Sequence, residues 1–265
     1  MPVTAALKRL SLATGTYRPA RWLSRRLRPS RRRAMQEDIG LYRRLLPRDA
    51  LCFDVGANIG EKSEAMLRAG AGRVVAFEPN PEVLPELVAR CSRWPNWTLV
   101  RAGLGAAPGL SMLYVRERHG QSGMLQDWGG RIMRTYHVPL LTLDAAVAHF
   151  GVPAYCKLDV EGWELEVLRG LGRPLPLVSF EFHLESRDIA KTRGCLELMR
   201  SHGEGRVNIT PAESAYFHYP EWQPLERFAG WFPGDLERTL PVDIYGDIFV
   251  SRTNSAPPEA RNASA

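Results

Sequence analysis

The chain has 265 residues, of which 45% are hydrophobic, 24% charged and 9% aromatic. These proportions are those of an ordinary globular protein, and they exclude collagen-like, low-complexity and wholly disordered chains. The length accommodates one α/β domain of roughly 200–250 residues. No uncharged apolar run approaches the roughly 20 residues that a membrane-spanning helix needs, so we expect a chain that does not cross a bilayer.

The net charge of +6 is concentrated at the amino-terminal end of the chain. Residues 1–33 contain ten basic residues and no acid, which leaves 25 basic and 29 acidic residues in 34–265. We therefore interpret 1–33 as a solvated basic arm and 34–252 as the folded domain, for which no specific nucleic-acid partner is implied. The alternatives for the arm are a peripheral contact with an anionic membrane, attraction to nucleic acid, or a transit peptide. Residues 253–265 are small and polar, and they are predicted to form a disordered tail.

Four cysteines are spread through the chain without any closely spaced pair. Cys52 and Cys156 lie in apolar, strand-like runs, where a free cysteine behaves as a small hydrophobe. Because no CxxC spacing indicates zinc and no disulfide framework is apparent, we expect free thiols and no metal site. This usage predicts a reducing, cytoplasmic setting.

From residue 50 onward, short apolar runs alternate with helical segments. The first predicted strands are Leu51–Val55, Arg73–Phe77 and Trp97–Val100. Predicted helices lie between them, at Glu61–Ala69 and from Val83 to Cys91. Near-continuous apolar runs separated by helices predict a parallel sheet that is covered on both faces.

Residues 103–143 interrupt this rhythm with two extra predicted strands, Met112–Val115 and His137–Leu141, around the glycine-rich segment 120–130. The alternation then resumes with helices near 143–150, 163–171 and 188–202 and with strands at 155–160, 177–183, 206–210 and 247–251. The whole pattern predicts a Rossmann-like, doubly wound α/β fold.

An insert at about 211–245 is rich in aromatic residues, with eight between Tyr216 and Tyr245. This enrichment indicates that the insert is folded rather than loose. We favour a hydrophobic cluster that covers the edge of the sheet. The alternative is that these rings stack on a sugar or an aromatic acceptor.

The turn after the first predicted strand reads Asp54-Val-Gly56-Ala57-Asn58-Ile-Gly60. Its glycines permit a tight turn and a close approach of ligand to backbone at the start of a helix. The dinucleotide fingerprint GxGxxG would place glycine where this chain has Asn58 and Glu61. Because acids at this turn also repel phosphates, the sequence argues against a pyrophosphate cofactor.

The second predicted strand ends in Phe77-Glu78-Pro79-Asn80-Pro81. A carboxylate at this place can accept hydrogen bonds from both hydroxyls of a ribose. An acid at the end of each of the first two strands, Asp54 and Glu78, therefore predicts a ribose-bearing ligand without phosphates, and it suits a cationic one. The alternative is a capped turn in which Glu78 faces solvent.

A second group of charged residues lies at the ends of two later predicted strands. Strict alternation places Lys157, Asp159 and Glu161 on one strand face, and Glu181 and His183 share a face of the next strand. Because the carboxyl ends of parallel strands meet at one edge of a sheet, we expect these side chains to converge there. The alternative is a structural role, with Lys157 in an ion pair and His183 in a fixed hydrogen bond.

Together these motifs resemble the class I S-adenosylmethionine-dependent methyltransferases, and most closely the FkbM family. The resemblance covers residues 51–183, and the combination of DVGANIG with KLDVEG is specific. Beyond the two turns it rests on Leu141-Thr-Leu-Asp144, Lys157-Leu-Asp159-Val-Glu161-Gly162, Val167-Leu-Arg-Gly170 and Phe180-Glu-Phe-His183. Where relatives carry paired serines in a glycine- and serine-rich loop, this chain has Ser122 alone.

The resemblance implies a seven-stranded, mostly parallel sheet and S-adenosyl-L-methionine as the cofactor. The implied cofactor-binding residues are Asp54, Gly56, Ala57, Asn58, Gly60, Glu78 and Asn80. It also implies methyl transfer to a hydroxyl of a saccharide or a small natural product, whose proton must leave during attack. Asp159 is the first candidate for the general base and Glu161 or His183 the next, while Lys157 would keep a neighbouring carboxylate ionised.

Several alternatives remain beside this interpretation. Methylation at nitrogen is the closest, and a divalent metal held by Glu181 and its acidic neighbours ranks lower because no ligand spacing stands out. From another class, the chain could be a catalytically silent cofactor-binding module that docks a partner, membrane or nucleic acid through its arm. An NAD-dependent oxidoreductase is disfavoured by Asn58 and Glu61. The sequence predicts neither a particular acceptor nor an oligomeric state.

Overall fold

The computed structural model describes residues 29–212, 214–240 and 245–252. The predicted arm up to residue 28 and the predicted tail 253–265 lie outside these residues. Within the described ranges, no helix combines the length and the apolar character that crossing a bilayer requires.

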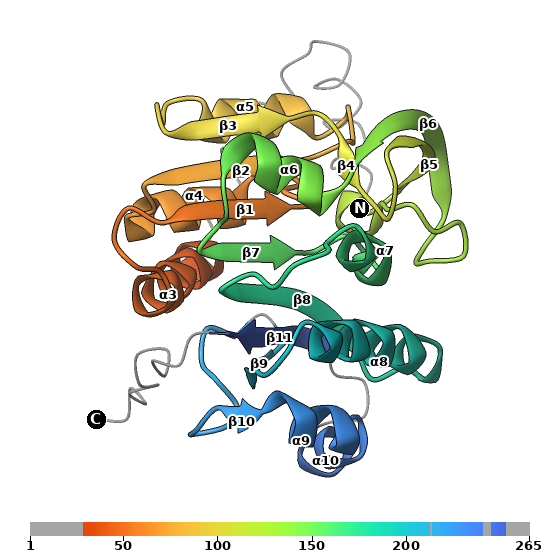
Figure 1. Ribbon diagram of the computed structural model, residues 1–265. Helices are drawn as coiled ribbons and strands as arrows, with labels where there is room; N and C mark the ends of the chain where they lie inside the picture. Colours follow the sequence, from red (N-terminus) through yellow and green to blue (C-terminus); the bar gives the residue numbers. More distant parts are fainter. Residues whose placement is uncertain (1–28, 213, 241–244, 253–265) are drawn as a thin grey trace.

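Helices and strands alternate along the described chain (Figure 1). The helices are α3 (Pro29–Leu45), α4 (Glu61–Ala69), α5 (Leu84–Cys91), η1 (His119–Gln121), α6 (Leu143–Phe150), α7 (Glu164–Arg169), α8 (Ser186–Ser201), α9 (Leu225–Trp231) and α10 (Gly234–Thr239). The strands are β1 (Leu51–Val55), β2 (Arg73–Phe77), β3 (Trp97–Val100), β4 (Gly103–Leu104), β5 (Gly109–Arg116), β6 (Ile132–Leu141), β7 (Tyr155–Leu158), β8 (Leu177–His183), β9 (Arg206–Pro211), β10 (Gln223–Pro224) and β11 (Tyr245–Ser251). Every strand and helix that the alternation predicts has a counterpart, whereas the helices α3, η1, α9 and α10 and the strands β4 and β10 were not predicted.

The main sheet has eight strands in the order β10-β9-β11-β8-β7-β1-β2-β3. Strands β3, β2, β1, β7 and β8 are parallel, while β11 runs antiparallel to both β8 and β9. This confirms the predicted Rossmann-like fold of class I methyltransferase type, with the two-residue β10 as an extra edge strand. The strand order reverses direction between β1 and β7, and the crevice at such a switch point is where open α/β sheets bind ligands.

Side chains of the parallel strands alternate between two hydrophobic layers. On β1, Cys52 packs with α3 and α4 on one face, whereas Phe53 and Val55 pack with α6, α7 and α8 on the other. Helices therefore cover both faces, as continuous apolar strands require. All four cysteines are buried and free, which confirms the prediction for the thiols.

Helix α3 moves the start of the folded part to Pro29, inside the predicted arm. Ile39 and Tyr42 are buried against α4, while Arg32 and Arg33 lie on the exposed face of the helix. A boundary drawn from charge alone misses such a helix because an amphipathic helix carries its basic residues on the solvent side.

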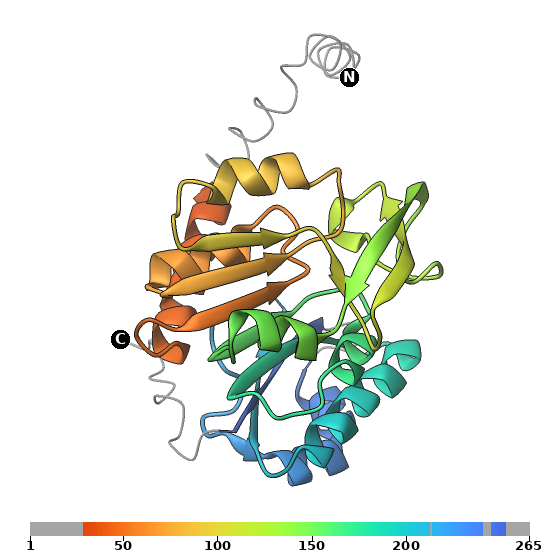
Figure 2. The same cartoon turned by 45° about the horizontal axis from the view of Figure 1, so that its top comes forward.

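The three-stranded sheet β4-β6-β5 stands beside the carboxyl ends of the parallel strands (Figures 1 and 2). Strands β5 and β6 form an antiparallel hairpin, and β4 joins its outer edge through parallel pairing with β6. We call residues 117–131, which connect β5 and β6, the hairpin loop. This loop forms one wall of the cavity described below.

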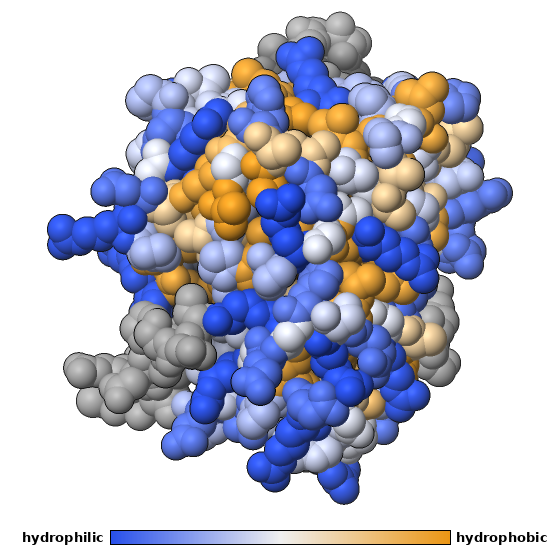
Figure 3. Space-filling view, viewed as in Figure 1, coloured by the Kyte–Doolittle hydropathy of each residue, from blue (hydrophilic) through white to orange (hydrophobic). Residues whose placement is uncertain are grey.

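The aromatic insert is folded in its described residues, as its composition predicted. Its buried aromatic residues belong to the two main hydrophobic clusters: Phe217, Trp222, Phe228 and Phe232. The surface over α9 and α10 is mostly hydrophilic (Figure 3). Most of the aromatic rings therefore extend the core, in agreement with the favoured interpretation, and Tyr245 differs because it faces the cavity.

Candidate functional site

A cavity of about 750 Å³ opens at the carboxyl ends of β1, β2, β7 and β8. Ten of the eleven predicted site residues form its wall: Asp54, Gly56, Ala57, Asn58, Glu78, Asn80, Lys157, Asp159, Glu161 and His183. Gly60 is not among the lining residues. It precedes α4 with φ 81°, and a Cβ there would lie 2.6 Å from a methyl carbon of Leu87, so Gly60 serves helix packing.

Gly56 brings the turn after β1 against the end of β7. Its φ is 83°, and a Cβ at this position would lie 1.8 Å from the carbonyl oxygen of Asp159. The N–H groups of Gly56 and Ala57 both donate to the carbonyl oxygen of Phe77, at 2.9 and 3.1 Å. The turn therefore connects β1, β2 and β7 at the point where the cavity begins.

The carboxylate of Glu78 is oriented by two backbone groups. The N–H of Asn58 donates to Oε2 at 2.6 Å, and the N–H of Asn80 donates to Oε1 at 2.7 Å. Burial raises the pKa of Glu78 to about 7, although these two hydrogen bonds oppose the shift. Each carboxylate oxygen can accept a further hydrogen bond. The structure therefore replaces a solvent-facing Glu78 with a buried acceptor pair on the cavity wall.

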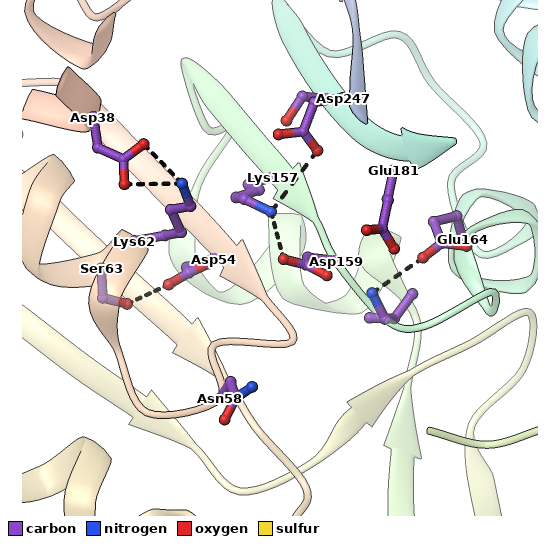
Figure 4. Close-up of polar contacts among 12 residues, drawn as sticks. Asp38, Asp54, Asn58, Lys62, Ser63, Lys157, Asp159, Glu164, Glu181 and Asp247 are labelled. Atoms are coloured by element: carbon purple, nitrogen blue, oxygen red, sulfur yellow. Dashed lines mark hydrogen bonds and ion pairs between the residues drawn. The ribbon is translucent and has the colours of Figure 1, made fainter. Parts of the chain in front are cut away.

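Helix α4 contacts both β1 and α3 at the site, through Ser63 and Lys62 respectively (Figure 4). The hydroxyl of Ser63 donates to Asp54 at 2.5 Å, and burial raises the pKa of this aspartate. Lys62 donates to both carboxylate oxygens of Asp38 at 2.7 and 2.8 Å. Asp38 belongs to α3, which the sequence pattern did not predict, so this pair was not predicted either.

Lys157 is a buried cation between two carboxylates (Figure 4). Its side chain is 2% exposed, and Nζ lies 2.8 Å from Oδ2 of Asp159 and 4.0 Å from Oδ1 of Asp247. Burial acts to lower the pKa of Lys157, but the carboxylates outweigh it and the pKa rises. Burial acts to raise the pKa of Asp159, but Lys157 outweighs it and the pKa falls. Lys157 therefore favours the ionised form of Asp159, whereas Asp247, on the antiparallel β11, was not predicted as a site residue.

Strand β7 ends at Leu158, two residues earlier than predicted, so the predicted alternation does not extend to Glu161. Glu161 has φ 55° and reaches the cavity from a turn rather than from a strand face. Oε1 of Glu164 holds this turn by accepting the N–H groups of Val160 at 3.1 Å and Gly162 at 3.2 Å. Burial raises the pKa of Glu164 to about 7. The sequence alone does not distinguish a buried glutamate that accepts the N–H groups of a turn from an exposed glutamate on the surface of a helix.

The hairpin loop contacts the end of β7 through Trp128. Its Nε1 donates to Oε2 of Glu161 at 3.0 Å. Burial, and then the charges of Asp159 and Glu181, raise the pKa of Glu161 to about 9. Glu161 is therefore protonated at neutral pH and is a hydrogen-bonding group there rather than an ionised base.

Arg116, the last residue of β5, holds the hairpin loop in place through hydrogen bonds. Its side chain is buried and donates to four backbone carbonyl oxygens, those of Tyr114, Gln121, Leu125 and Gln126. The hydroxyl of Ser122 accepts the N–H of Arg116 at 3.0 Å, so this serine has a structural contact at the cavity wall. Because one buried arginine binds several backbone carbonyl groups of the loop, the loop has a fixed conformation where it forms the cavity wall.

His183 and Glu181 follow each other on one face of β8, as predicted, and both line the cavity. His183 Nε2 lies 3.3 Å from Glu181 Oε2. The ring of Trp128 meets the His183 ring edge to face at 5.3 Å, and Tyr245 stacks on it at 5.8 Å. Among the residues that the structure describes, no group of three or more His, Cys, Asp or Glu side chains is placed to hold a metal ion.

The raised pKa of Glu161 predicts a pH-dependent stability. A carboxyl group whose pKa is higher in the folded state stabilises that state at low pH, and this contribution is lost as pH rises toward about 9. Glu161→Gln mimics the protonated form and keeps an acceptor for Trp128. We expect its free energy of unfolding to exceed that of the wild type by on the order of 2 kcal/mol near pH 8, and to match it near pH 4.5. Urea denaturation at the two pH values measures the difference.

Glu117→Gln is the matched control, because Glu117 is exposed on the same loop. We expect its stability to follow the wild type at both pH values. A loss of stability in Glu161→Gln that is equal at both pH values would contradict the neutral state of Glu161.

Comparison with solved structures finds methyltransferases at low sequence identity. Precorrin-6y C5,15-methyltransferase from Geobacter metallireducens is 15% identical, with 82% of this chain and 86% of that chain covered and a TM-score of 0.44. Fibrillarin from Aeropyrum pernix, solved with natively bound S-adenosyl-L-methionine, is 10% identical, with 77% and 66% covered and a TM-score of 0.41.

Two sequence comparisons are more specific. The hexuronic acid methyltransferase AglP of Haloferax volcanii is 30% identical over 166 residues, which are 60% of this chain and 67% of that protein. The family model of the methyltransferase FkbM domain matches residues 54–204. The match begins at Asp54 in β1 and includes Glu78, Lys157, Asp159 and His183. The chain therefore belongs to the FkbM methyltransferase family.

Proposed function

We propose that this protein transfers the methyl group of S-adenosylmethionine to a hydroxyl oxygen of a saccharide. Membership of the FkbM family supports methyl transfer, and the similarity to a hexuronic acid methyltransferase supports a saccharide acceptor. The observation that carries the proposal is that the glycine turn and Glu78 open into the same cavity as Asp159 and His183. A cofactor and an acceptor bound there would lie side by side.

The cavity wall fits S-adenosylmethionine, which supplies an electrophilic methyl group when bound. Gly56 lets the turn approach the end of β7 closely, because the Cβ of any other residue would collide with the carbonyl oxygen of Asp159. The two oxygens of Glu78 are fixed in position and can accept the hydroxyls of a ribose. The ionised Asp159 attracts positive charge, and Asp54 beneath the turn disfavours a phosphate.

The opposite side of the cavity offers polar groups for a hydroxylated acceptor. They come from the hairpin loop and from β8: Arg118, Gln121, Ser122, Glu181 and His183. An alcohol does not ionise near neutral pH, so its attack on a methyl carbon requires a base within hydrogen-bonding reach. Holding the acceptor oxygen in line with the methyl group supplies much of the remaining rate acceleration.

Calorimetry with S-adenosylhomocysteine tests the cofactor site. We expect the wild type to bind this compound and not NAD. Glu78→Gln should weaken binding at least about tenfold, because its amide replaces an acceptor oxygen with donors that face the N–H of Asn58 or Asn80. Because the pKa of Glu78 is about 7, wild-type affinity should fall as pH drops from about 8 to 6, and the variant should lack this dependence.

Glu82→Gln is the control, since Glu82 follows the same turn but accepts from Tyr136 and Arg134 outside the cavity. Its affinity and pH dependence should match the wild type. Preference for NAD, or no binding of S-adenosylhomocysteine, contradicts the proposed cofactor. Failure to methylate any of a panel of uronides and neutral hexosides contradicts the proposed acceptor.

A further inference from the structure

We infer that His183 accepts the proton of the acceptor hydroxyl while Glu181 orients its ring. Trp128 and Tyr245 are positioning residues that hold this ring in place. The inference rests on the proposed function, and it gives the role of base to His183 rather than to Asp159.

His183 is placed where an acceptor can reach it. It is the last residue of β8, its side chain is 27% exposed, and it lines the cavity. Nε2 lies 3.3 Å from Oε2 of Glu181, which is an ion-pair distance, and within residues 29–212, 214–240 and 245–252 neither of these two buried atoms has a hydrogen-bond partner. With the proton of the neutral ring on Nε2, facing Glu181, Nδ1 is the nitrogen that can accept a proton.

Two aromatic rings from different elements restrain the imidazole. Tyr245 lies opposite His183 across the antiparallel pair β8–β11, and their rings stack at 5.8 Å with an interplanar angle of 22°. Trp128 approaches from the hairpin loop, with its ring at 78° to the imidazole. A base that is already oriented loses little freedom when the acceptor binds.

Trp128 is itself fixed by three neighbours. Its indole N–H donates to Glu161, and the ammonium of Lys191 lies 4.5 Å from the centre of its ring. Gly162 admits the ring, because a Cβ there would lie 2.7 Å from it. The hairpin loop therefore reaches His183 through a packed contact, and the position of the base depends on this loop.

The charges around His183 suit a base better than those around Asp159. Burial acts to lower the pKa of His183, but Glu181 outweighs it and raises the pKa, with Asp188 of α8 and Glu164 of α7 acting in the same direction. A base is most effective when its pKa is close to the working pH. The pKa of Asp159 is held low by the ammonium beside it, which makes that carboxylate a weak proton acceptor.

The step balances with these groups. The acceptor O–H bond breaks and its proton passes to Nδ1 of His183. The acceptor oxygen forms a bond to the methyl carbon as the carbon–sulfur bond breaks, and the electron pair of that bond remains on sulfur. The imidazolium, stabilised by Glu181, then releases its proton to solvent.

NMR titration of the histidine rings in the isotope-labelled full-length protein tests the dyad without any acceptor. We assign the His183 signal by its loss in His183→Asn, with the exposed His137→Asn as the matched control. We expect His183 to titrate above the ordinary value of about 6.5, and Glu181→Gln to shift its titration to lower pH. A wild-type midpoint at or below that value, or no shift in Glu181→Gln, overturns the inference.

Methyl transfer to methyl glucuronide tests the catalytic role. We expect His183→Asn to lower the single-turnover rate at least about 100-fold, with affinity for S-adenosylhomocysteine unchanged within about threefold. The rise of the wild-type rate with pH should move to lower pH in Glu181→Gln, by the shift that NMR measures. His137→Asn should retain the wild-type rate. A wild-type rate in His183→Asn overturns the inference.

The same experiments separate this inference from the proposed function. No binding of S-adenosylhomocysteine by the wild type overturns the proposed function, and the role of His183 falls with it. Binding and methylation with a rate that does not respond to His183 overturn the base alone. A transferred methyl group that mild alkali releases is an ester on a carboxylate, which needs no base, and this outcome also overturns the role of His183.

Discussion

Replacing Lys157 by methionine is expected to lower the free energy of unfolding by about 3 kcal/mol near pH 8, the largest stability effect of any single charge in the site. Methionine fills a similar volume but leaves Asp159 and Asp247 facing each other without a cation. Carboxylate charges without a cation raise the free energy of the folded state, because the protein interior screens their repulsion poorly. Urea denaturation followed by circular dichroism measures the loss.

The pH dependence of this loss has a definite sign. The pKa of Lys157 is raised in the folded protein, so its contribution is fully present below about pH 10 and does not change between pH 5 and pH 8. In Lys157→Met the two carboxylates become easier to protonate, so the variant should recover stability relative to the wild type as pH falls to about 5. Arg33→Met removes a charge from an exposed pair with Glu37 and should cost at most about 0.5 kcal/mol at either pH. A deficit for Lys157→Met as small as that of Arg33→Met would contradict the buried network.

The strand ends of the site could be predicted because they depend on local patterns. Asp54 and Glu78 each follow an uninterrupted apolar run, and such runs form parallel strands whose carboxyl ends meet at one edge of the sheet. Lys157 alternates with apolar neighbours on its strand, so its face was predictable too. The position of each of these residues follows from its immediate neighbours in the sequence, so no information about distant segments is needed to place it.

The rest of the site depends on tertiary contacts that no local pattern contains. Asp38 reaches Lys62 because α3 packs beside α4, and its own surroundings in sequence are those of an ordinary helix. Trp128 reaches His183 because Arg116 binds the carbonyl groups of a loop whose only regular element is the short helix η1. The error at Glu161 has a local cause, since the strand gives way to a turn that a glycine then continues at φ 88°. The Glu-Gly pair after a strand is the signal that indicates such a turn.

The raised pKa values of carboxyl groups in the cavity wall and behind it are also a tertiary property, and they link stability to the proposed function. Burial raises the pKa of Glu78 and Glu164 to about 7 and that of Glu161 to about 9. Each of these groups makes the folded protein less stable as pH rises from 4.5, the ordinary pKa of a glutamate, to the raised pKa of the group itself. The proposed cofactor is cationic, and its binding beside these carboxyl groups would offset their mutual repulsion.

The largest loss of cofactor binding is expected from Gly56→Ala. Its Cβ would lie 1.8 Å from the carbonyl oxygen of Asp159, and real Cβ contacts are essentially never shorter than 3.0 Å. The obstructing atom is backbone, so the turn after β1 and the end of β7 must separate. That movement breaks the hydrogen bonds from Gly56 and Ala57 to Phe77, and with them the placement of Asn58 against Glu78. We expect affinity for S-adenosylhomocysteine to fall at least about 100-fold, with a loss of stability of about 3 kcal/mol.

Gly70→Ala separates the collision from the effect of backbone conformation. Gly70 also has a positive φ, 104°, but a Cβ there would meet no atom within 4 Å. Strain in the left-handed region should therefore cost Gly70→Ala about 1 kcal/mol of stability and leave cofactor affinity unchanged. Calorimetry and thermal unfolding of both variants decide the point. If Gly56→Ala binds S-adenosylhomocysteine as well as Gly70→Ala does, the contact between the turn and β7 does not shape the cofactor site, and the cofactor lies elsewhere in the cavity.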